Sequence, residues 1–152
     1  MVDALGDISA PDRADRGGVR SIRLRIPAKA EYITLCRLAL TGLAQLRPVA
    51  DDTLADVKLA LTEAVSNSVR HAYGPDGQGL VDILYELSAR ELRIEVVDDG
   101  EGFDPDETPS FDGDELSEGG LGIQIIRTIA DDLEIESAPG RRGSRLRFVK
   151  QL

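Results

Sequence analysis

The stretch ELRIEVVDDGEGFDPDE, residues 91–107, holds the features that decide the fold of this chain. Its first eight residues alternate apolar and polar side chains, which is the pattern of a strand with one buried face. Asp98 ends that strand, and Gly100 and Gly102 follow it. A carboxylate at a strand end can accept a hydrogen bond from an exocyclic amine, and glycines let a backbone approach a ligand closely. An ordinary acidic turn would use the same residues, so this stretch alone leaves both interpretations open.

Three common binding loops are not expected in this sequence. An EF-hand needs oxygen ligands at positions 1, 3 and 5 of the loop, with glycine at position 6. Placing either Gly100 or Gly102 sixth puts Val97 at a ligand position, so a calcium loop of this type is not expected. The sequence also contains no GxxxxGK[ST] and no complete GxGxxG, which excludes a P-loop and a dinucleotide-binding fingerprint.

The residues before this stretch predict two strands and two helices. SIRLRIP (21–27) alternates like a strand, and leucines at helical spacing follow it between residues 35 and 46. A second helix begins at an acidic pair and covers residues 51–72, until GPDGQG (74–79) stops it. LVDILYEL (80–87) predicts a strand that a short turn joins to the strand at 91–98, which indicates an antiparallel hairpin.

The residues after this stretch predict one helix and two strands. LGIQIIRTIADD (121–132) has helical spacing, and LEIES (133–137) and SRLRFVKQL (144–152) alternate like strands. The order of elements indicates an α+β fold, a two-layer sandwich in which helices cover one face of a mixed, mostly antiparallel sheet. Residues 1–19 lack apolar periodicity and predict a flexible tail, so we expect a single domain over residues 20–152.

Charge and composition limit the partners. The formal net charge is −10, and ten of the 28 acidic residues lie between Asp98 and Glu118, where there is no Lys or Arg. The other 18 acidic residues balance the 18 basic ones, so no basic surplus is available for direct binding of nucleic acid. No apolar run approaches the roughly 20 residues that span a membrane, and Cys36 has no second cysteine to pair with. We therefore expect a cytoplasmic protein with no nucleic-acid or membrane partner.

Two further stretches contain candidate site residues. In LTEAVSNSVRHA (61–72), Glu63 and Asn67 are four residues apart and share one helix face. This face lies roughly opposite the apolar stripe, so both side chains are expected to point away from it, as in an ordinary solvated face. In EGGLGIQII (118–126), glycines come immediately before a helix, so free amides and the positive end of the helix dipole can face a phosphate.

Three segments resemble one known family when they are taken together. TEAVSNSVRHA (62–72), DDGEGFDP (98–105) and EGGLGIQII (118–126) are similar, in this order and spacing, to the N, G1 and G2 boxes of the GHKL ATPases and kinases. The residues of these segments are most similar to those of the RsbW-like branch, the anti-sigma factor serine/threonine kinases. The resemblance extends from about residue 21 to the C-terminus. It implies the Bergerat fold of the histidine-kinase-like ATPases, with ATP and Mg²⁺ as cofactors.

The resemblance implies a role for each candidate residue. Glu63 matches the catalytic carboxylate that acts as general base, and Asn67 matches the side chain that binds the nucleotide through Mg²⁺. Asp98 matches the aspartate that accepts a hydrogen bond from the adenine amino group. The other matches lie beside the adenine (Gly100, Gly102 and Ser144) or near the phosphates (Gly120, Leu121 and Gly122). Ser144 stands where the family usually has threonine, and it keeps the hydroxyl.

The resemblance also divides the acidic segment. Residues 98–102 match the floor of the adenine pocket, and residues 104–118 match the ATP lid, although a solvated loop would have the same composition. The lid contains seven acidic residues and no Lys or Arg. Mg²⁺, Arg70 or a basic residue of a partner therefore has to offset the charge of the phosphates. His71 is interpreted as a structural histidine, because the histidine kinases of this superfamily carry their phosphoacceptor on a separate helical hairpin.

The function that the resemblance implies is an ATP-dependent protein serine/threonine kinase that acts as an anti-sigma factor. It would phosphorylate a STAS-type anti-anti-sigma partner, sequester a sigma factor and form a homodimer, for which the first helix is a candidate interface. The alternative is a non-catalytic nucleotide-binding anti-sigma or adaptor module. A fragment of a sensor histidine kinase or of a gyrase-like ATPase is not expected, because the sequence leaves no room for the extra domain of those proteins.

Overall fold

The computed structural model describes residues 18–72, 79–106 and 118–152. Within these residues the chain order is β1 (Arg20–Pro27), the short 3-10 helix η2 (Ala30–Tyr32), α1 (Ile33–Ala44), α2 (Asp51–Ala72), β2 (Leu80–Leu87), β3 (Glu91–Asp98), α3 (Glu118–Ile129), β4 (Asp132–Glu136) and β5 (Ser144–Gln151). Most of the predicted tail, of the segment predicted to stop the second helix and of the predicted ATP lid lies outside the described residues.

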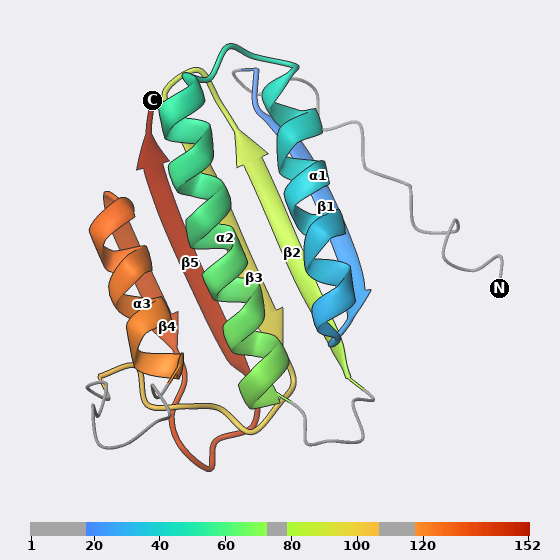
Figure 1. Cartoon of the computed structure of the whole chain (residues 1–152), viewed down its shortest axis with the longest axis vertical. Helices are drawn as coiled ribbons and strands as arrows, with labels where there is room; N and C mark the ends of the chain where they lie inside the picture. Colours follow the sequence, from blue (N-terminus) through green and yellow to red (C-terminus); the bar gives the residue numbers. More distant parts are fainter. Residues whose placement is uncertain (1–17, 73–78, 107–117) are drawn as a thin grey trace, which may run out of the picture.

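The strands form one sheet in the order β1-β2-β3-β5-β4 (Figure 1). All four pairings between the described strands are antiparallel. β2 and β3 form the predicted hairpin, whose turn is closed by the backbone N–H of Glu91, which donates to Ser88 Oγ at 3.1 Å. β3 pairs with β5 on its other side, so that Asp98 at the end of β3 faces Ser144 at the start of β5.

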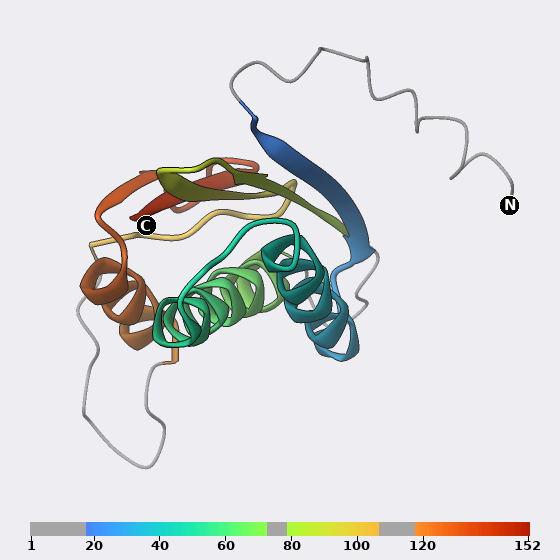
Figure 2. The same cartoon turned by 90° about the horizontal axis from the view of Figure 1, so that it is seen from above.

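The hydrophobic core lies between the sheet and the helices. The α-helices of the described residues, α1, α2 and α3, cover the same face of the sheet, with α2 between α1 and α3 (Figure 2). The strands alternate buried and partly exposed residues, as a sheet with one covered face requires. Tyr85 and Phe148 are among the largest fully buried side chains. The Tyr85 hydroxyl donates a hydrogen bond of 2.8 Å to the carbonyl of Cys36, which ties α1 to β2.

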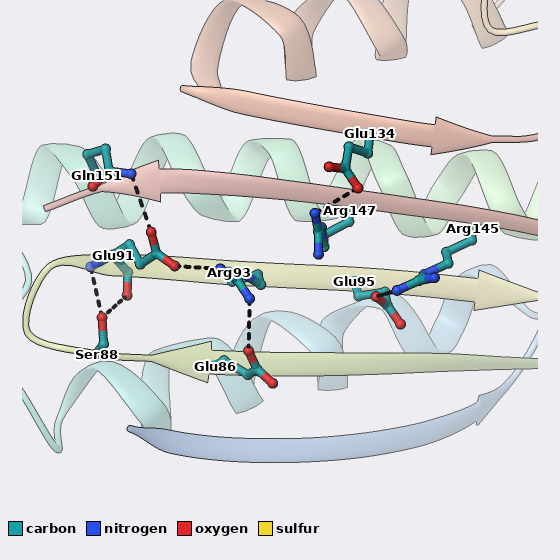
Figure 3. A network of polar contacts seen from close by, with 9 residues as sticks. All are labelled: Glu86, Ser88, Glu91, Arg93, Glu95, Glu134, Arg145, Arg147 and Gln151. Carbon is teal, nitrogen blue, oxygen red and sulfur yellow. Dashed lines mark hydrogen bonds and ion pairs between the residues drawn. The ribbon is translucent and has the colours of Figure 1, made fainter. Parts of the chain in front are cut away.

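The opposite face of the sheet is polar and carries ion pairs between neighbouring strands (Figure 3). Arg147 of β5 pairs with Glu134 of β4 at 2.7 Å, and Arg145 pairs with Glu95 of β3 at the same distance. Opposite charges at neighbouring positions of an antiparallel sheet favour this register. This charged face accounts for the polar half of the alternation in the sequence.

The predicted α+β sandwich, with helices on one face, is confirmed, and β2 and β3 have the predicted bounds. Besides shifts of one or two residues at the ends of β1, α1, β4 and β5, two details differ from the prediction. The sequence favours a mixed sheet, whereas every described pairing is antiparallel. The helix predicted over 121–132 begins and ends three residues earlier, as α3. Among the described residues, no helix combines the length and the apolar character needed to cross a membrane.

The shift of α3 has a physical cause at each end. The glycines of residues 119–122 are weak helix formers, but α3 packs along α2, and tertiary packing overrides propensity. At the other end, the backbone N–H of Asp131 donates to the carbonyl of Val149 at 2.8 Å, and Asp132 then pairs with Val149 in the sheet. The sheet therefore takes up the residues that the sequence pattern assigns to the last helical turn.

Candidate functional site

The candidate site lies at one end of the molecule. The C-terminal ends of α2 and β3, the beginning of α3 and the beginning of β5 all lie at the lower end in Figure 1. α2 also contacts β3, β5 and α3. Residues from three distant parts of the sequence are thus brought to the same end of the fold.

Asp98 is held in a fixed orientation by two hydrogen bonds. The Ser144 hydroxyl donates to its Oδ2 at 2.5 Å, and the backbone N–H of Gly100 donates to its Oδ1 at 3.0 Å. Asp98 is 7% exposed and Ser144 is 8% exposed. Each carboxylate oxygen can accept a further hydrogen bond, so this oriented group suits an amine donor. The structure therefore brings together three of the predicted adenine-binding residues.

Gly102 allows the loop after β3 to pack against the connection between β4 and β5. Its φ is +78°, and a Cβ atom built on it would lie 2.4 Å from the carbonyl oxygen of Ala138 and 2.5 Å from that of Arg141. Next to it, the backbone N–H of Phe103 donates to Ser137 Oγ at 2.9 Å. No other residue type fits this close approach, so the glycine predicted from the sequence has a structural reason.

Asn67 is buried, which contradicts the prediction that both polar residues of α2 point away from the apolar seam. It is 3% exposed, and its neighbour Ser68 is 4% exposed. The reason is that α2 lies between two helices above the sheet (Figure 2), so much more than one stripe of this helix is covered. Within the described residues, Asn67 Oδ1 has no hydrogen-bond partner. A buried amide oxygen without a partner is costly, and it indicates a position that a ligand completes.

Glu63 lies against α3. It is half-buried, and a Cβ atom built on Gly122 would lie only 2.7 Å from Glu63 Oε2. Of the two residues predicted with Gly122 near the phosphates, Leu121 is 45% exposed and Gly120 lies in the first turn of α3. The predicted glycine turn is therefore part of the helix rather than a loop before it.

Two arginines that the sequence analysis does not assign to the site lie beside the beginning of the acidic segment. Arg142, in the connection between β4 and β5, pairs with Asp99 at 3.1 Å. Its hydrogen bond and its charge hold the pKa of Asp99 below the usual range. Arg127 of α3 lies 3.7 Å from Asp106. The sequence shows Arg142 as part of the basic pair in PGRRG (139–143), but it does not show that this pair lies beside the acidic segment.

Other predictions about charge concern residues that are only partly described. Arg70 is exposed near the end of α2. The side chain of His71 and residues 107–117 lie outside the described part of the structure. The interpretations of His71 as a structural residue and of the acidic segment as a lid therefore stay predictions.

The donor set fits a magnesium ion better than a metal cage made by the protein. Among the residues that the structure describes, no group of three or more His, Cys, Asp or Glu side chains is placed to hold a metal. Mg²⁺ bound with a nucleotide takes few protein ligands and prefers oxygen. The buried Oδ1 of Asn67 is such a donor, so the residues present fit this ion.

Comparison with known proteins identifies the family. The model of the histidine kinase-like ATPase domain matches residues 26–150. The chain is 36% identical over 127 residues to the serine-protein kinase RsbW of Bacillus velezensis, covering 78% of this chain and 79% of that protein. It is 35% identical over 139 residues to the serine-protein kinase RsbW of Staphylococcus aureus, covering 86% of this chain and 87% of that protein.

A solved structure has the same fold. The crystal structure of the RsbU and RsbW domains of a Mycobacterium tuberculosis protein superposes with a TM-score of 0.64, at 18% sequence identity. The match covers 88% of this chain and 32% of that one. The family model, the two relatives and this fold agree with the three sequence segments that resemble the N, G1 and G2 boxes. The chain belongs to the histidine kinase-like ATPase domain family and, within it, to the group of serine-protein kinases named RsbW.

Proposed function

We propose that this chain is an ATP-dependent protein kinase that transfers the γ-phosphoryl group of ATP to a serine or threonine of a partner protein. The observation that carries the proposal is the pair of groups on α2: a half-buried Glu63 against α3, and a buried Asn67 whose Oδ1 has no partner in the described structure. Both belong to the C-terminal half of α2, and this helix ends at the same end of the fold as β3, which carries the oriented carboxylate of Asp98.

The adenine end of the site follows from Asp98. Its carboxylate is fixed by Ser144 and by the backbone of Gly100, so it can accept a hydrogen bond from the exocyclic amine of adenine. A guanine base carries a carbonyl oxygen at the corresponding ring position, and this acceptor would face another acceptor. The proposal is therefore an adenine nucleotide rather than a guanine nucleotide.

The phosphate end of the site follows from the α2 pair. Asn67 would hold Mg²⁺ through Oδ1 and thereby position the triphosphate. When bound, Mg²⁺ offsets the negative charge of the phosphates. Glu63 would orient the hydroxyl of the substrate and accept its proton as the oxygen attacks phosphorus. The carboxylate does not need to contact the nucleotide for this role.

Residues 104–118 of the acidic segment would form an ATP lid. Arg142 pairs with Asp99, which precedes the lid, and Arg127 pairs with Asp106, near the beginning of the lid. These pairs reduce the negative charge near the site without placing an arginine inside the lid. They support the proposal that the lid is compatible with a nucleotide. Mg²⁺, Arg70 or a basic residue of a partner would offset the remaining charge.

The partners are proposed from the relatives. A protein kinase of the RsbW group would phosphorylate a STAS-type anti-anti-sigma protein and sequester a sigma factor, so the chain would act in the cytoplasm as an anti-sigma factor.

We include a homodimer in the proposal. Three leucines of α1 and the turn after it, Leu35, Leu38 and Leu46, are between 48% and 60% exposed, which supports this surface as the interface. Sedimentation analysis of Leu38→Glu against the wild type tests it: a dimer that loses mass in the variant is expected, and a monomeric wild type would contradict it.

The function is tested by phosphate transfer to a purified STAS-domain protein encoded next to this gene. Glu63→Gln should lower the transfer rate about 10²- to 10⁴-fold, because the amide cannot accept the proton, while ATP still binds. Glu134→Gln, which makes the same change at an exposed position of β4, is the matched control and should leave the rate unchanged. Normal transfer by Glu63→Gln would show that the base is assigned wrongly. Tight ATP binding without transfer by the wild-type protein would favour the non-catalytic adaptor.

A further inference from the structure

Gly122 and Glu63 lie so close together that any residue other than glycine at position 122 would disturb the contact. A Cβ atom on Gly122 would lie 2.7 Å from Glu63 Oε2 and 3.7 Å from both Cβ and Cδ of Glu63. Gly122 is buried in α3, and α3 packs along α2. The Glu63 carboxylate therefore occupies the space that a side chain at position 122 would fill.

Glycine at this position is not explained by the backbone. It lies inside α3, where alanine is the better helix former, and its φ is not positive. A helical glycine is then expected where another group has to come close to the backbone. Gly42 of α1 provides the contrast, because a Cβ atom built there meets nothing within 4 Å.

We propose that Gly122 is a positioning residue for phosphoryl transfer, because its missing side chain leaves the space that fixes the Glu63 carboxylate. The inference rests on the proposed function, in which Glu63 is the general base. It adds a second role to the glycine, besides the contact with phosphates that the family resemblance implies. The position of α3 against α2 then sets where the base meets the hydroxyl of the substrate.

A methyl group at position 122 should slow the reaction rather than destabilise the fold. The atom that it would meet first is the end of a flexible glutamate side chain, which can rotate away. Alanine also keeps the backbone N–H of the glycine, so a phosphate contact through that N–H is retained. The displaced carboxylate, in contrast, no longer meets the attacking hydroxyl, and a shift of about 1 Å at a reacting group can cost about 10²-fold in rate.

The test compares Gly122→Ala with Gly42→Ala in steady-state transfer to the STAS-domain protein and in equilibrium binding of Mg·ATP. Gly122→Ala should lower kcat about 10- to 100-fold, with unchanged ATP affinity. Gly42→Ala, the same change in open space on another helix, should keep kcat and the thermal unfolding midpoint at or above the wild-type values. A wild-type kcat for Gly122→Ala, or a loss of its ATP binding, would overturn the inference.

A double variant separates this inference from the proposed function. If Gly122 acts through Glu63, Glu63→Gln with Gly122→Ala should transfer phosphate as slowly as Glu63→Gln alone, because effects on one catalytic unit are not additive. A further loss in the double variant would overturn the positioning role. A slow Glu63→Gln together with an active Gly122→Ala rejects this inference only. An active Glu63→Gln rejects the base assignment, and the inference with it.

Discussion

At the scale of single residues, the site is made of polar groups buried at the edge of an apolar core. Asn67, Ser68, Asp98 and Ser144 are the polar residues buried in the described structure. Asp98 and Ser144 satisfy each other through a hydrogen bond of 2.5 Å, whereas Asn67 Oδ1 has no partner there. Buried polar groups in native proteins are almost always paired. This difference fits the proposed roles, in which Asp98 is a prearranged acceptor for the base and Asn67 is completed by a bound ion or nucleotide.

Tyr85 provides a prediction about stability. Its buried hydroxyl donates to the Cys36 carbonyl at 2.8 Å. Tyr85→Phe removes this hydrogen bond and keeps the packing of the ring, so it should lower the free energy of unfolding by about 0.5–1.5 kcal/mol at pH 7. Urea unfolding of both proteins measures the difference. A variant as stable as the wild type would mean that the bond between α1 and β2 does not contribute.

The same residue provides a pH dependence. Burial, and then the neighbouring Cys36, raise the pKa of the Tyr85 phenol above its ordinary value. Below about pH 10 both the folded and the unfolded chain keep the proton, so this stabilisation is fully present there. Above that pH only the unfolded chain loses the proton, so stability should fall. The fall in stability between pH 9 and 11 should be smaller in Tyr85→Phe, and equal slopes would contradict this.

At the scale of elements, two glycines with nearly equal positive φ provide a matched pair. Gly102 and Gly140 have φ of +78° and +76°. A Cβ atom at Gly102 would lie 2.4 Å from the carbonyl oxygen of Ala138, but at Gly140 it would meet nothing within 4 Å. Gly140→Ala should therefore lower the free energy of unfolding by about 1–2 kcal/mol, because alanine disfavours a positive φ. Gly102→Ala should lower it by a further ~1–3 kcal/mol, because the loop after β3 has to move.

Nucleotide binding should separate the same two variants. The loop that contains Gly102 also contains Gly100, whose N–H orients Asp98 at 3.0 Å. Gly102→Ala should thus weaken ATP binding in titration calorimetry, whereas Gly140→Ala should bind ATP like the wild type. Equal affinities in the two variants would show that the packing of this loop does not hold the adenine site.

Elements with a strong local pattern were predictable from the sequence. β2 and β3 have the predicted bounds because each is a run of eight residues rich in strand-forming side chains, and a short turn joins the two runs. α3 was placed three residues too late because its start depends on packing against α2 and its end on pairing of Asp132 with Val149. Neither contact is visible in a local pattern, since each joins residues that are distant in sequence.

For the candidate site, the sequence predicted which residues to consider but not all of their surroundings. Glu63, Asp98 and the glycines were proposed because their segments resemble the N, G1 and G2 boxes, and their roles stay predictions. The burial of Asn67 was not found, because it depends on helices on both sides of α2 (Figure 2). The arginines were not found either, because Arg142 meets Asp99 only when the connection between β4 and β5 folds beside the end of β3.

At the scale of the whole molecule, the fold has one buried side and one charged side. The helices cover one face of the sheet, and the other face carries ion pairs between strands (Figures 2 and 3). Buried apolar side chains and exposed ion pairs make very different contributions to stability, because water screens the charges on the open face. The stability of the molecule should therefore depend almost entirely on the covered face.

A graded series of variants across the sheet tests this division. Phe148 and Ile94 are fully buried and face each other across β5 and β3, whereas Glu134 is on the open face and pairs with Arg147 at 2.7 Å. In urea unfolding, Phe148→Ala should lower the free energy of unfolding by about 3–5 kcal/mol and Ile94→Val by about 0.5–1.5 kcal/mol. Glu134→Gln should lower it by less than about 1 kcal/mol. If Phe148→Ala does not fold, Ile94→Val still measures the covered face. A loss in Glu134→Gln larger than that in Ile94→Val would mean that the ion pairs of the open face, rather than the core alone, hold the sheet together.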